Sequence, residues 1–164
     1  MEKGPARVET PPLGKSLVMI HRPRNAQGWR LYTGVWDGKK FLADLGNGHS
    51  FAYVCEPGPH HFINRSVERV GVVEANLLPD KTYDLRVDIA GAFIASFQLE
   101  PVTRSHKSWK KTAAWSTEHL WVTRNTAAAS HEEQRQRDIE LILKDFVGGE
   151  KKDRLRQLRS EDHR

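Results

Sequence analysis

Histidine is the residue type in this chain that most invites a chemical role, because the 164 residues include eight histidines. A neutral imidazole is a common ligand of zinc, but two histidines share an ion only when they point the same way. His60 and His61 are adjacent on an expected strand, so their side chains point to opposite faces. No pair of histidines follows an H-x-H or H-x-x-x-H spacing. We therefore interpret the histidines as polar surface residues and expect no metal and no cofactor.

One serine lies in a segment that partly matches a catalytic motif. The residues Gly48-His49-Ser50-Phe51-Ala52 approach the G-x-S-x-G pattern of hydrolases, with alanine in place of the last glycine. That pattern requires a strand, a sharp turn and then a helix. Here a turn leads into a strand, so the match is interpreted as chance. We assign no catalytic residue and expect that the protein is not an enzyme.

Charged and apolar residues alternate between positions 82 and 89. The apolar residues share one face of the expected strand, and Asp84, Arg86 and Asp88 lie on the other. Such alternation is typical of a strand that is buried on one side and solvated on the other. The three charges are therefore predicted to lie in solvent, paired with neighbouring strands.

A basic, tryptophan-bearing segment follows the strands. Tryptophan beside lysine suits a protein groove, a nucleic-acid surface or a membrane interface. On a helix the three tryptophans would point about 120° apart, whereas on a strand they would share one face. Packing against the rest of the protein is the simpler interpretation. The candidate interaction residues here are Trp109, Lys110, Lys111, Trp115 and Trp121.

An amphipathic helix is predicted from residue 130 to residue 147. Ser130 and Glu133 fit a capping box at its start, and Gly148-Gly149 ends it. Its apolar stripe is narrow, so the helix is expected to dock either on its own protein or on a second copy. The stripe consists of Ile139, Ile142, Leu143 and Phe146.

Turn signals and alternating runs predict an all-β domain. Asp37-Gly38, Asn47-Gly48 and Pro57-Gly58 mark tight turns between short strands. This pattern favours an antiparallel β-sandwich of the immunoglobulin or prealbumin type, with a C-terminal α-helical appendage. Eight strands are expected, at residues 16–22, 30–36, 40–45, 49–55, 60–66, 69–78, 82–89 and 92–100.

The chain is expected to divide into four parts. Residues 1–14 form a flexible lead, and residues 15–102 form the β-sandwich, which should fold alone. Residues 103–129 form a tryptophan-containing linker. Residues 130–160 form a helical segment, with a second helix from about residue 150.

Composition limits the partners and the compartment. The net charge is +5, neither half of the chain has a strong charge of one sign, and acidic residues interrupt the densest basic run, so nucleic acid is not expected as a partner. The chain shows no leader and no apolar run of about 18–20 residues that could span a membrane. We therefore expect a cytoplasmic protein whose membrane contact, if any, is peripheral. A periplasmic or envelope location would follow only if a leader has been removed.

Several segments together resemble a known family. The match covers about residues 15–102, and His21 stands where the family usually has an aromatic residue. The segments that carry the resemblance are Leu17-Val18-Met19-Ile20-His21-Arg22-Pro23, Asp37-Gly38-Lys39-Lys40, Leu45-Gly46-Asn47-Gly48, Phe51-Ala52-Tyr53, Glu56-Pro57-Gly58-Pro59-His60 and Leu78-Pro79-Asp80-Lys81-Thr82-Tyr83.

The chain resembles a bacterial domain-of-unknown-function family of small β-sandwich proteins, many of them lipoproteins, with a PEGA-like pattern. The resemblance implies an all-β sandwich without established enzymatic activity and a frequent location in the cell envelope. We therefore expect a non-enzymatic binding or protein-interaction module, with a protein partner or self-association through the C-terminal helix. The alternative is an electrostatic binder of nucleic acid or anionic membrane through the basic, tryptophan-bearing tail.

Overall fold

The protein is rich in β-structure. The computed structural model describes residues 8–65, 69–90, 96–122 and 128–164. Within these residues the strands are β1 (Ser16–Arg22), β2 (Thr33–Asp37), β3 (Lys40–Leu45), β4 (His49–Cys55), β5 (Gly58–Arg65), β6 (Val70–Leu77), β7 (Thr82–Ala90), β8 (Ser96–Pro101), β9 (Leu120–Trp121) and β10 (Arg156–Leu158). The helices are η1 (Trp109–Lys111), α1 (Thr112–Glu118), α2 (Ala128–Val147) and η2 (Lys152–Arg154).

The strands in this described part of the chain form two five-stranded sheets. Sheet A has the order β8-β7-β1-β4-β9, and sheet B has the order β10-β6-β5-β2-β3. The expectation of antiparallel sheets is wrong, because β1 pairs with β7, β4 with β9, and β6 with β10 in parallel. Alternation along a strand shows which side chains share a face, but it carries no information on the direction of the neighbouring strand.

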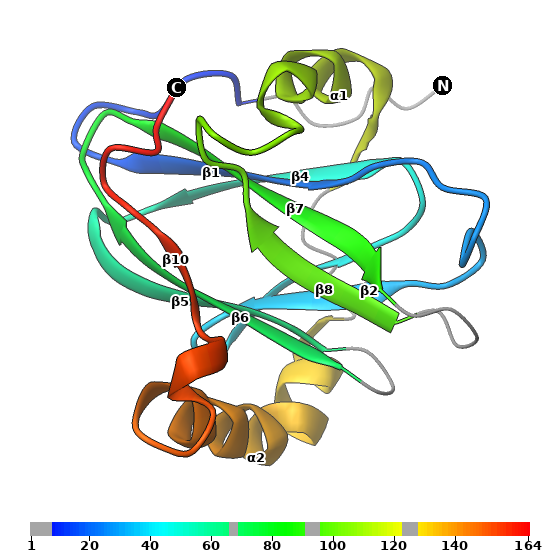
Figure 1. Ribbon diagram of the computed structural model, residues 1–164, viewed down its shortest axis with the longest axis vertical. Helices are drawn as coiled ribbons and strands as arrows, with labels where there is room; N and C mark the ends of the chain where they lie inside the picture. The colour runs from blue at the N-terminus through cyan, green and yellow to red at the C-terminus, as the bar shows by residue number, and fades with distance from the viewer. Residues whose placement is uncertain (1–7, 66–68, 91–95, 123–127) are drawn as a thin grey trace.

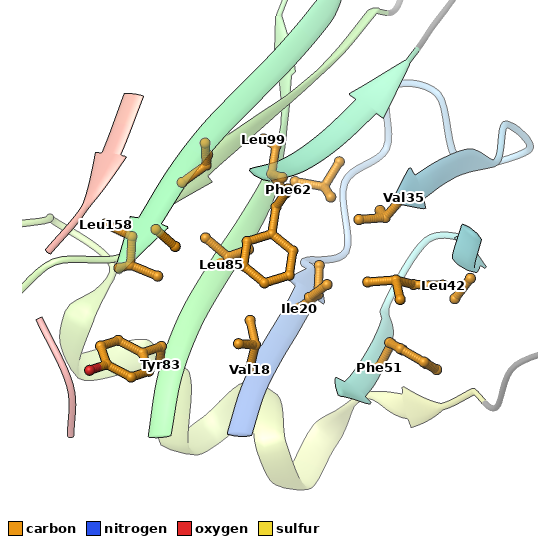
Figure 2. Packing of buried hydrophobic residues seen from close by; sticks show 14 of the residues in the cluster. Val18, Ile20, Val35, Leu42, Phe51, Phe62, Tyr83, Leu85, Leu99 and Leu158 are labelled. Carbon is orange, nitrogen blue, oxygen red and sulfur yellow. The ribbon is translucent and has the colours of Figure 1, made fainter. Parts of the chain in front are cut away.

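The main hydrophobic core lies between the two sheets, as Figure 2 shows. Its members alternate along most strands, as the period of two predicts, whereas Leu42 and Ala43 are adjacent members on β3. Sheet A contributes Val18, Ile20, Phe51, Tyr83, Leu85 and Leu99, among others, and sheet B contributes Val35, Leu42, Phe62 and Leu158.

The helices cover the outer faces of the sheets. In Figure 1, α1 lies beyond sheet A at the top and α2 lies beyond sheet B at the bottom. A second core cluster joins Ile139 and Phe146 of α2 to Trp36, Phe41 and Ile63 of sheet B, with Ile142 and Leu143 packed at its margin. The expected apolar stripe of the helix therefore docks on its own protein. The expected capping box of Ser130 and Glu133 falls on side chains outside the described residues.

Residues after position 102 complete both sheets. The two-residue strand β9 extends sheet A beside β4, and β10 extends sheet B beside β6. The prediction of a second helix from residue 150 is wrong, because η2 and β10 occupy this segment. The expected linker contains η1 and α1. None of the helices in the described part of the chain combines the length and apolar composition needed to cross a bilayer.

The turn before β4 yields a first test. Gly48 has a φ of +73°, and a Cβ placed there would lie 2.7 Å from Cγ of Arg24. We expect Gly48→Val to lower the free energy of unfolding by about 1–3 kcal/mol, because a β-branched residue is strained at positive φ. Lys40→Ala, at an exposed position, should stay within about 0.5 kcal/mol. Denaturant melts compare the two variants, and equal losses would contradict the turn assignment.

Candidate functional site

The short helix α1 brings tryptophan and histidine together on the outer face of sheet A. Trp115 is 7% exposed, and its ring centroid lies 5.5 Å from that of His21 on β1. Trp121 on β9 lies on another side of the same imidazole at 6.2 Å. His119 follows α1 and stacks on Trp115 at 6.1 Å. The aromatic rings therefore enclose a fully buried histidine.

A chain of polar contacts runs through this enclosure. Ser50 Oγ lies 2.8 Å from Nδ1 of His21 and 2.8 Å from Nδ1 of His119. On its other side, His21 Nε2 lies 3.0 Å from Oδ1 of Asp84, and Oδ2 of Asp84 forms an ion pair with Nε of Arg164 at 2.8 Å. Ser50, His21 and Asp84 are all 0% exposed. We call these five residues the buried relay.

Two sequence-based interpretations are corrected by this geometry. His21 and His119 are buried and so are not surface histidines. Asp84 was expected in solvent, but α1 and the C-terminal residues cover the outer face of β7 around it. A pattern of alternating polarity cannot distinguish a face that meets water from a face that meets a helix carrying polar partners.

One set of proton positions satisfies the relay. A carboxylate accepts, so Nε2 of His21 donates to Asp84 and Nδ1 of His21 accepts from the hydroxyl of Ser50. The serine oxygen then accepts from Nδ1–H of His119. These tautomers follow from the hydrogen-bond network. Consistent with a neutral His119, burial is the largest cause that lowers its pKa to about 4.

The relay contains serine, histidine and aspartate, the residue types of a nucleophilic triad. Ser50 lies within β4, has no exposed surface, and is already held by two imidazoles. A nucleophile must reach the substrate, and this hydroxyl contacts only the protein interior. The arrangement can order protons and fix α1 on the sheet, but the Ser50 hydroxyl is not presented to a ligand.

The relay predicts a pH dependence of stability. In the folded protein His119 takes up a proton only near pH 4, instead of near its ordinary pKa of 6.5. The unfolded chain binds more protons between these values, so stability falls as the pH is lowered through this window, by up to about 3 kcal/mol. Asparagine at position 119 keeps an N–H donor near the place of Nδ1 without titrating. We expect His119→Asn to flatten the acid limb of a plot of melting temperature against pH.

Other histidines titrate in the same range, so the difference between the two proteins is the informative quantity. The pKa of His49 is lowered by burial, whereas a hydrogen bond to Asp37 raises the pKa of His60. The His60 contribution is present below pH 6.5 and disappears as the pH rises through its folded pKa. His119 is not among the groups that shift the pKa of His60, so this contribution cancels in the difference between the two proteins. Parallel curves for the wild type and His119→Asn would contradict the assignment.

A pocket of about 320 Å³ opens beside the relay, between the end of β1, the outer face of β7 and α1. We call it the α1 pocket. Three of its lining side chains are cationic and one is a carboxylate, so positive charge is in excess. The pocket is lined by Pro23, Arg24, Arg86, Ser108, Lys111, Trp115, Glu118 and His119.

Arg86 is the innermost cation of the pocket, with a side chain that is 16% exposed. Its guanidinium donates to Oγ of Ser108 at 2.6 Å and to Oδ1 of Asp88 at 2.8 Å. It also lies 5.7 Å from the ring centroid of Trp115. Nε of Arg86 has no hydrogen-bond partner in the part of the chain that the structure describes. The group is thus held in place while retaining donor capacity.

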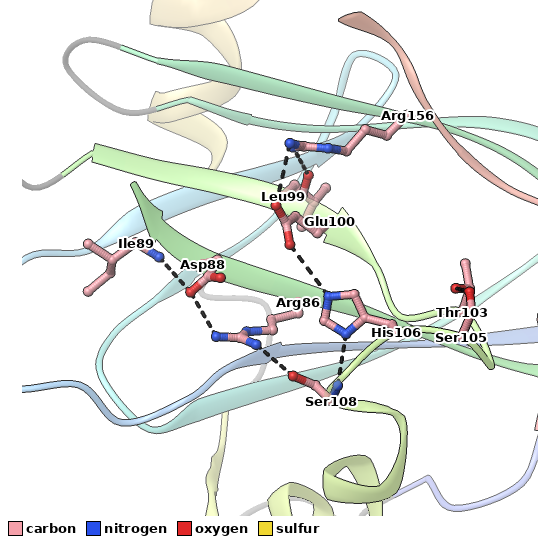
Figure 3. Close-up of polar contacts among 10 residues, drawn as sticks. All are labelled: Arg86, Asp88, Ile89, Leu99, Glu100, Thr103, Ser105, His106, Ser108 and Arg156. Atoms are coloured by element: carbon pink, nitrogen blue, oxygen red, sulfur yellow. Dashed lines mark hydrogen bonds and ion pairs between the residues drawn. The ribbon is translucent and has the colours of Figure 1, made fainter. Parts of the chain in front are cut away.

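Figure 3 shows how the wall that carries Ser108 is fixed. The backbone N–H of Ser108 donates to Nδ1 of His106 at 3.0 Å, and Nε2 of His106 lies 3.6 Å from Glu100 on β8. Glu100 in turn pairs with Arg156 of β10 at 3.4 Å. This series of contacts ties the loop before α1 to both sheets. The position of Arg86 therefore depends on residues that are far apart in the sequence.

The structure separates the sequence-predicted interaction residues into two groups. Lys111 and Trp115 line the α1 pocket, Trp121 lies behind it, and Trp109 and Lys110 belong to η1 just before α1. The residues of the α2 stripe lie on the opposite side of the molecule, against sheet B.

Sequence analysis missed the partners of Lys111 and Trp115. The pocket residues that were not proposed from the sequence are Pro23, Arg24, Arg86, Ser108, Glu118 and His119. The sequence of β1 indicates that polar side chains are buried there, because His21 and Arg22 directly follow an apolar run. A strand without alternation is typically covered on both faces, so its polar residues are candidates for buried pairing.

Among the described residues, no three histidine, cysteine, aspartate or glutamate side chains are arranged to hold a metal ion. Comparison with known proteins adds no assignment for this chain. No family model matches it, and no curated protein matches it either.

Proposed function

We propose that this protein is a non-enzymatic binding module built on a β-sandwich, and that its α1 pocket recognises the anionic group of a small ligand. The observation that carries the proposal is the excess of cations in the pocket. Arg24, Arg86 and Lys111 line it, and among the lining residues that the structure describes Glu118 alone is acidic.

The spare capacity of these cations supports the proposal. Arg24 and Lys111 are exposed, and no ion pair to either is formed within the described part of the chain. Arg86 supplies a planar guanidinium that is already oriented by Asp88 and Ser108. Guanidinium groups bind carboxylates and phosphates through paired hydrogen bonds. An anion in the pocket would meet the guanidinium of Arg86, which is already oriented, and the exposed side chains of Arg24 and Lys111.

Size and composition narrow the ligand class. The volume of about 320 Å³ is at the small end of the range for ligand pockets, about 300–1,000 Å³. It suits a phosphate or carboxylate with a small organic part. The ring of Trp115 forms one wall and offers an apolar surface to that part. We therefore propose a phosphorylated or carboxylated small molecule as the ligand.

The alternatives from the sequence have less support. Binding of nucleic acid or membrane through the tryptophans of the tail would need exposed rings, whereas Trp115 is buried and Trp121 donates its indole N–H to the Ser116 carbonyl at 3.0 Å. Self-association through the α2 stripe would need free apolar side chains, whereas Ile139 and Phe146 are buried against sheet B.

Isothermal titration calorimetry of the full chain with inorganic phosphate and with acetate tests the proposal. We expect both anions to bind at low ionic strength and tetramethylammonium not to bind. Lys111→Ala should weaken phosphate binding by about tenfold, because a hydrogen bond to a charged group is lost. Lys110→Ala is the matched control, since Lys110 is an adjacent exposed lysine that does not line the pocket.

The Lys110→Ala control distinguishes a specific binding site in the α1 pocket from a general effect of net charge on the affinity for phosphate. Equal weakening by Lys111→Ala and Lys110→Ala would indicate that only net charge matters and would contradict the pocket assignment. Absence of heat with both anions would also contradict it. Because Lys110 and Lys111 are both exposed, each variant is expected to keep the wild-type melting temperature.

A further inference from the structure

The loop between β1 and β2 carries an unusual surface. Trp29 is 56% exposed, Leu31 is 45% exposed and Tyr32 is 64% exposed, so three large apolar residues face solvent within four positions. In Figure 1 this loop extends from the right-hand edge of the two sheets. Single exposed apolar residues are ordinary, but a cluster of them indicates an interaction surface.

A buried arginine holds this exposed loop in shape. Arg22 is 1% exposed, and its guanidinium donates to the backbone carbonyl groups of Gly28 at 2.8 Å, of Leu45 at 2.6 Å, and of Leu31. The same group lies 4.2 Å from the ring centroid of Phe97. Burial lowers the pKa of Arg22 to about 10, which leaves it charged at neutral pH. The hydrogen bonds from the Arg22 guanidinium to these carbonyl groups thus fix the path of the loop.

Further contacts anchor the loop at its ends. The backbone N–H of Asn25 donates to Oδ1 of Asn47 at 2.8 Å, and the ring of Tyr32 meets that of His49 edge-on at 6.0 Å. His49 is the register partner of Leu120, which is 63% exposed. The exposed Leu120 at the edge of sheet A is therefore paired with the strand residue that Tyr32 contacts. A surface that is ordered before it binds loses less entropy on binding.

The charges of the loop indicate what kind of surface it meets. Residues 23–32 include Arg24 and Arg30 and contain no acidic residue. The guanidinium of Arg30 lies over the ring of Trp29, 4.5 Å from its centroid, and both side chains are exposed. Tryptophan and tyrosine are favoured at the level of lipid headgroups, and arginine attracts anionic lipids there.

We propose that the β1–β2 loop, with Leu120 beside it, is a docking element for an anionic lipid surface. Trp29, Leu31 and Tyr32 enter the headgroup region while Arg30 pairs with lipid phosphates. Insertion of a few side chains gives reversible, peripheral binding. Trp29, Arg30, Leu31 and Tyr32 do not line the α1 pocket, so either proposal can fail without the other.

Co-sedimentation of the full chain with lipid vesicles tests this inference. We expect the protein to sediment with phosphatidylcholine vesicles that contain phosphatidylglycerol and to remain in solution with pure phosphatidylcholine. Trp29→Ala combined with Tyr32→Ala should reduce the bound fraction by about tenfold or more, and Arg30→Ala by about fivefold. Leu141→Ala is the control, because Leu141 is 61% exposed on α2, away from the loop.

Several outcomes would overturn the inference. These are absence of binding to the anionic vesicles, equal binding to both kinds of vesicle, and loop variants that bind like the wild type. Excess inorganic phosphate separates a lipid surface from a soluble phosphate site. With the ionic strength held constant, retention of the protein on vesicles in the presence of phosphate is expected, whereas full release would contradict docking through the loop.

Discussion

Replacement of Asp84 by alanine is expected to lower the free energy of unfolding by about 3–5 kcal/mol, the range for removing one partner of a buried ion pair. The variant leaves Arg164 without its carboxylate and leaves Nε2 of His21 without an acceptor inside the protein. The matched control is Asp88→Ala, four positions along the same strand. The Asp88 side chain is 27% exposed and pairs with Arg86, so its loss should be at most about 1 kcal/mol.

Chemical denaturation of both variants gives the comparison. Asp84→Asn keeps the shape of the side chain and should give an intermediate loss, which guards against a variant that fails to fold. Similar losses for Asp84→Ala and Asp88→Ala would mean that both carboxylates lie in solvent, as the alternating pattern of β7 predicts. That result would contradict the buried relay.

Deletion of residues 156–164 is expected to abolish cooperative unfolding. The deletion removes β10 from sheet B and, with it, Leu158, which is 1% exposed in the main core. It also removes the acceptor at the Ser160 carbonyl for the Tyr83 hydroxyl, and the pairing of Arg164 with Asp84. Loss of a core leucine contributes about 2–5 kcal/mol and an unpaired buried charge a similar amount. Together they approach the total stability of a typical domain, about 5–15 kcal/mol.

Thermal denaturation followed by circular dichroism measures this effect. Leu158→Ala and Gln157→Ala form a matched pair on β10, since Leu158 is buried and Gln157 is exposed. We expect a loss of about 2–5 kcal/mol for the first and a change within about 0.5 kcal/mol for the second. A cooperative melt of the deletion variant at the wild-type temperature would contradict this prediction and would show that β10 and the residues after it are not needed for the fold.

Much of the fold was predictable because turns and alternation are local properties. The expected strands at residues 16–22, 40–45 and 49–55 match β1, β3 and β4 in full. Gly38 and Gly48 have positive φ, as their turns require. The helix expected at residues 130–147 ends where α2 ends. Each of these elements is determined by neighbouring residues in the sequence.

The parallel pairs and the last two strands could not be predicted in this way. β9 has two residues and β10 has three, which is too short to show a period. Their formation depends on free backbone groups at the edges of β4 and β6 and, for β10, on the burial of Leu158. Such long-range pairing is invisible in a local pattern.

The site was predicted only in part for the same reason. The combination of tryptophan and lysine in the tail pointed to Lys111 and Trp115, but their partners come from β1, β7 and the loop before α1. Arg86 was taken for a solvated charge because its strand alternates. Its role depends on α1, Ser108 and His106, which reach it only in the folded protein.

The central claim is that an anion binds among Arg24, Arg86 and Lys111 beside Trp115. Nuclear magnetic resonance of the full chain, labelled with nitrogen-15 and titrated with inorganic phosphate, tests it most directly. The five tryptophans provide separate indole N–H signals, and Trp36 is an internal reference because it is buried against α2 on the far side of the molecule. We predict that the signals of the Trp115 indole and the Arg86 Nε–H shift and saturate while that of Trp36 stays in place. Unchanged Trp115 and Arg86 signals at saturating phosphate would contradict the account.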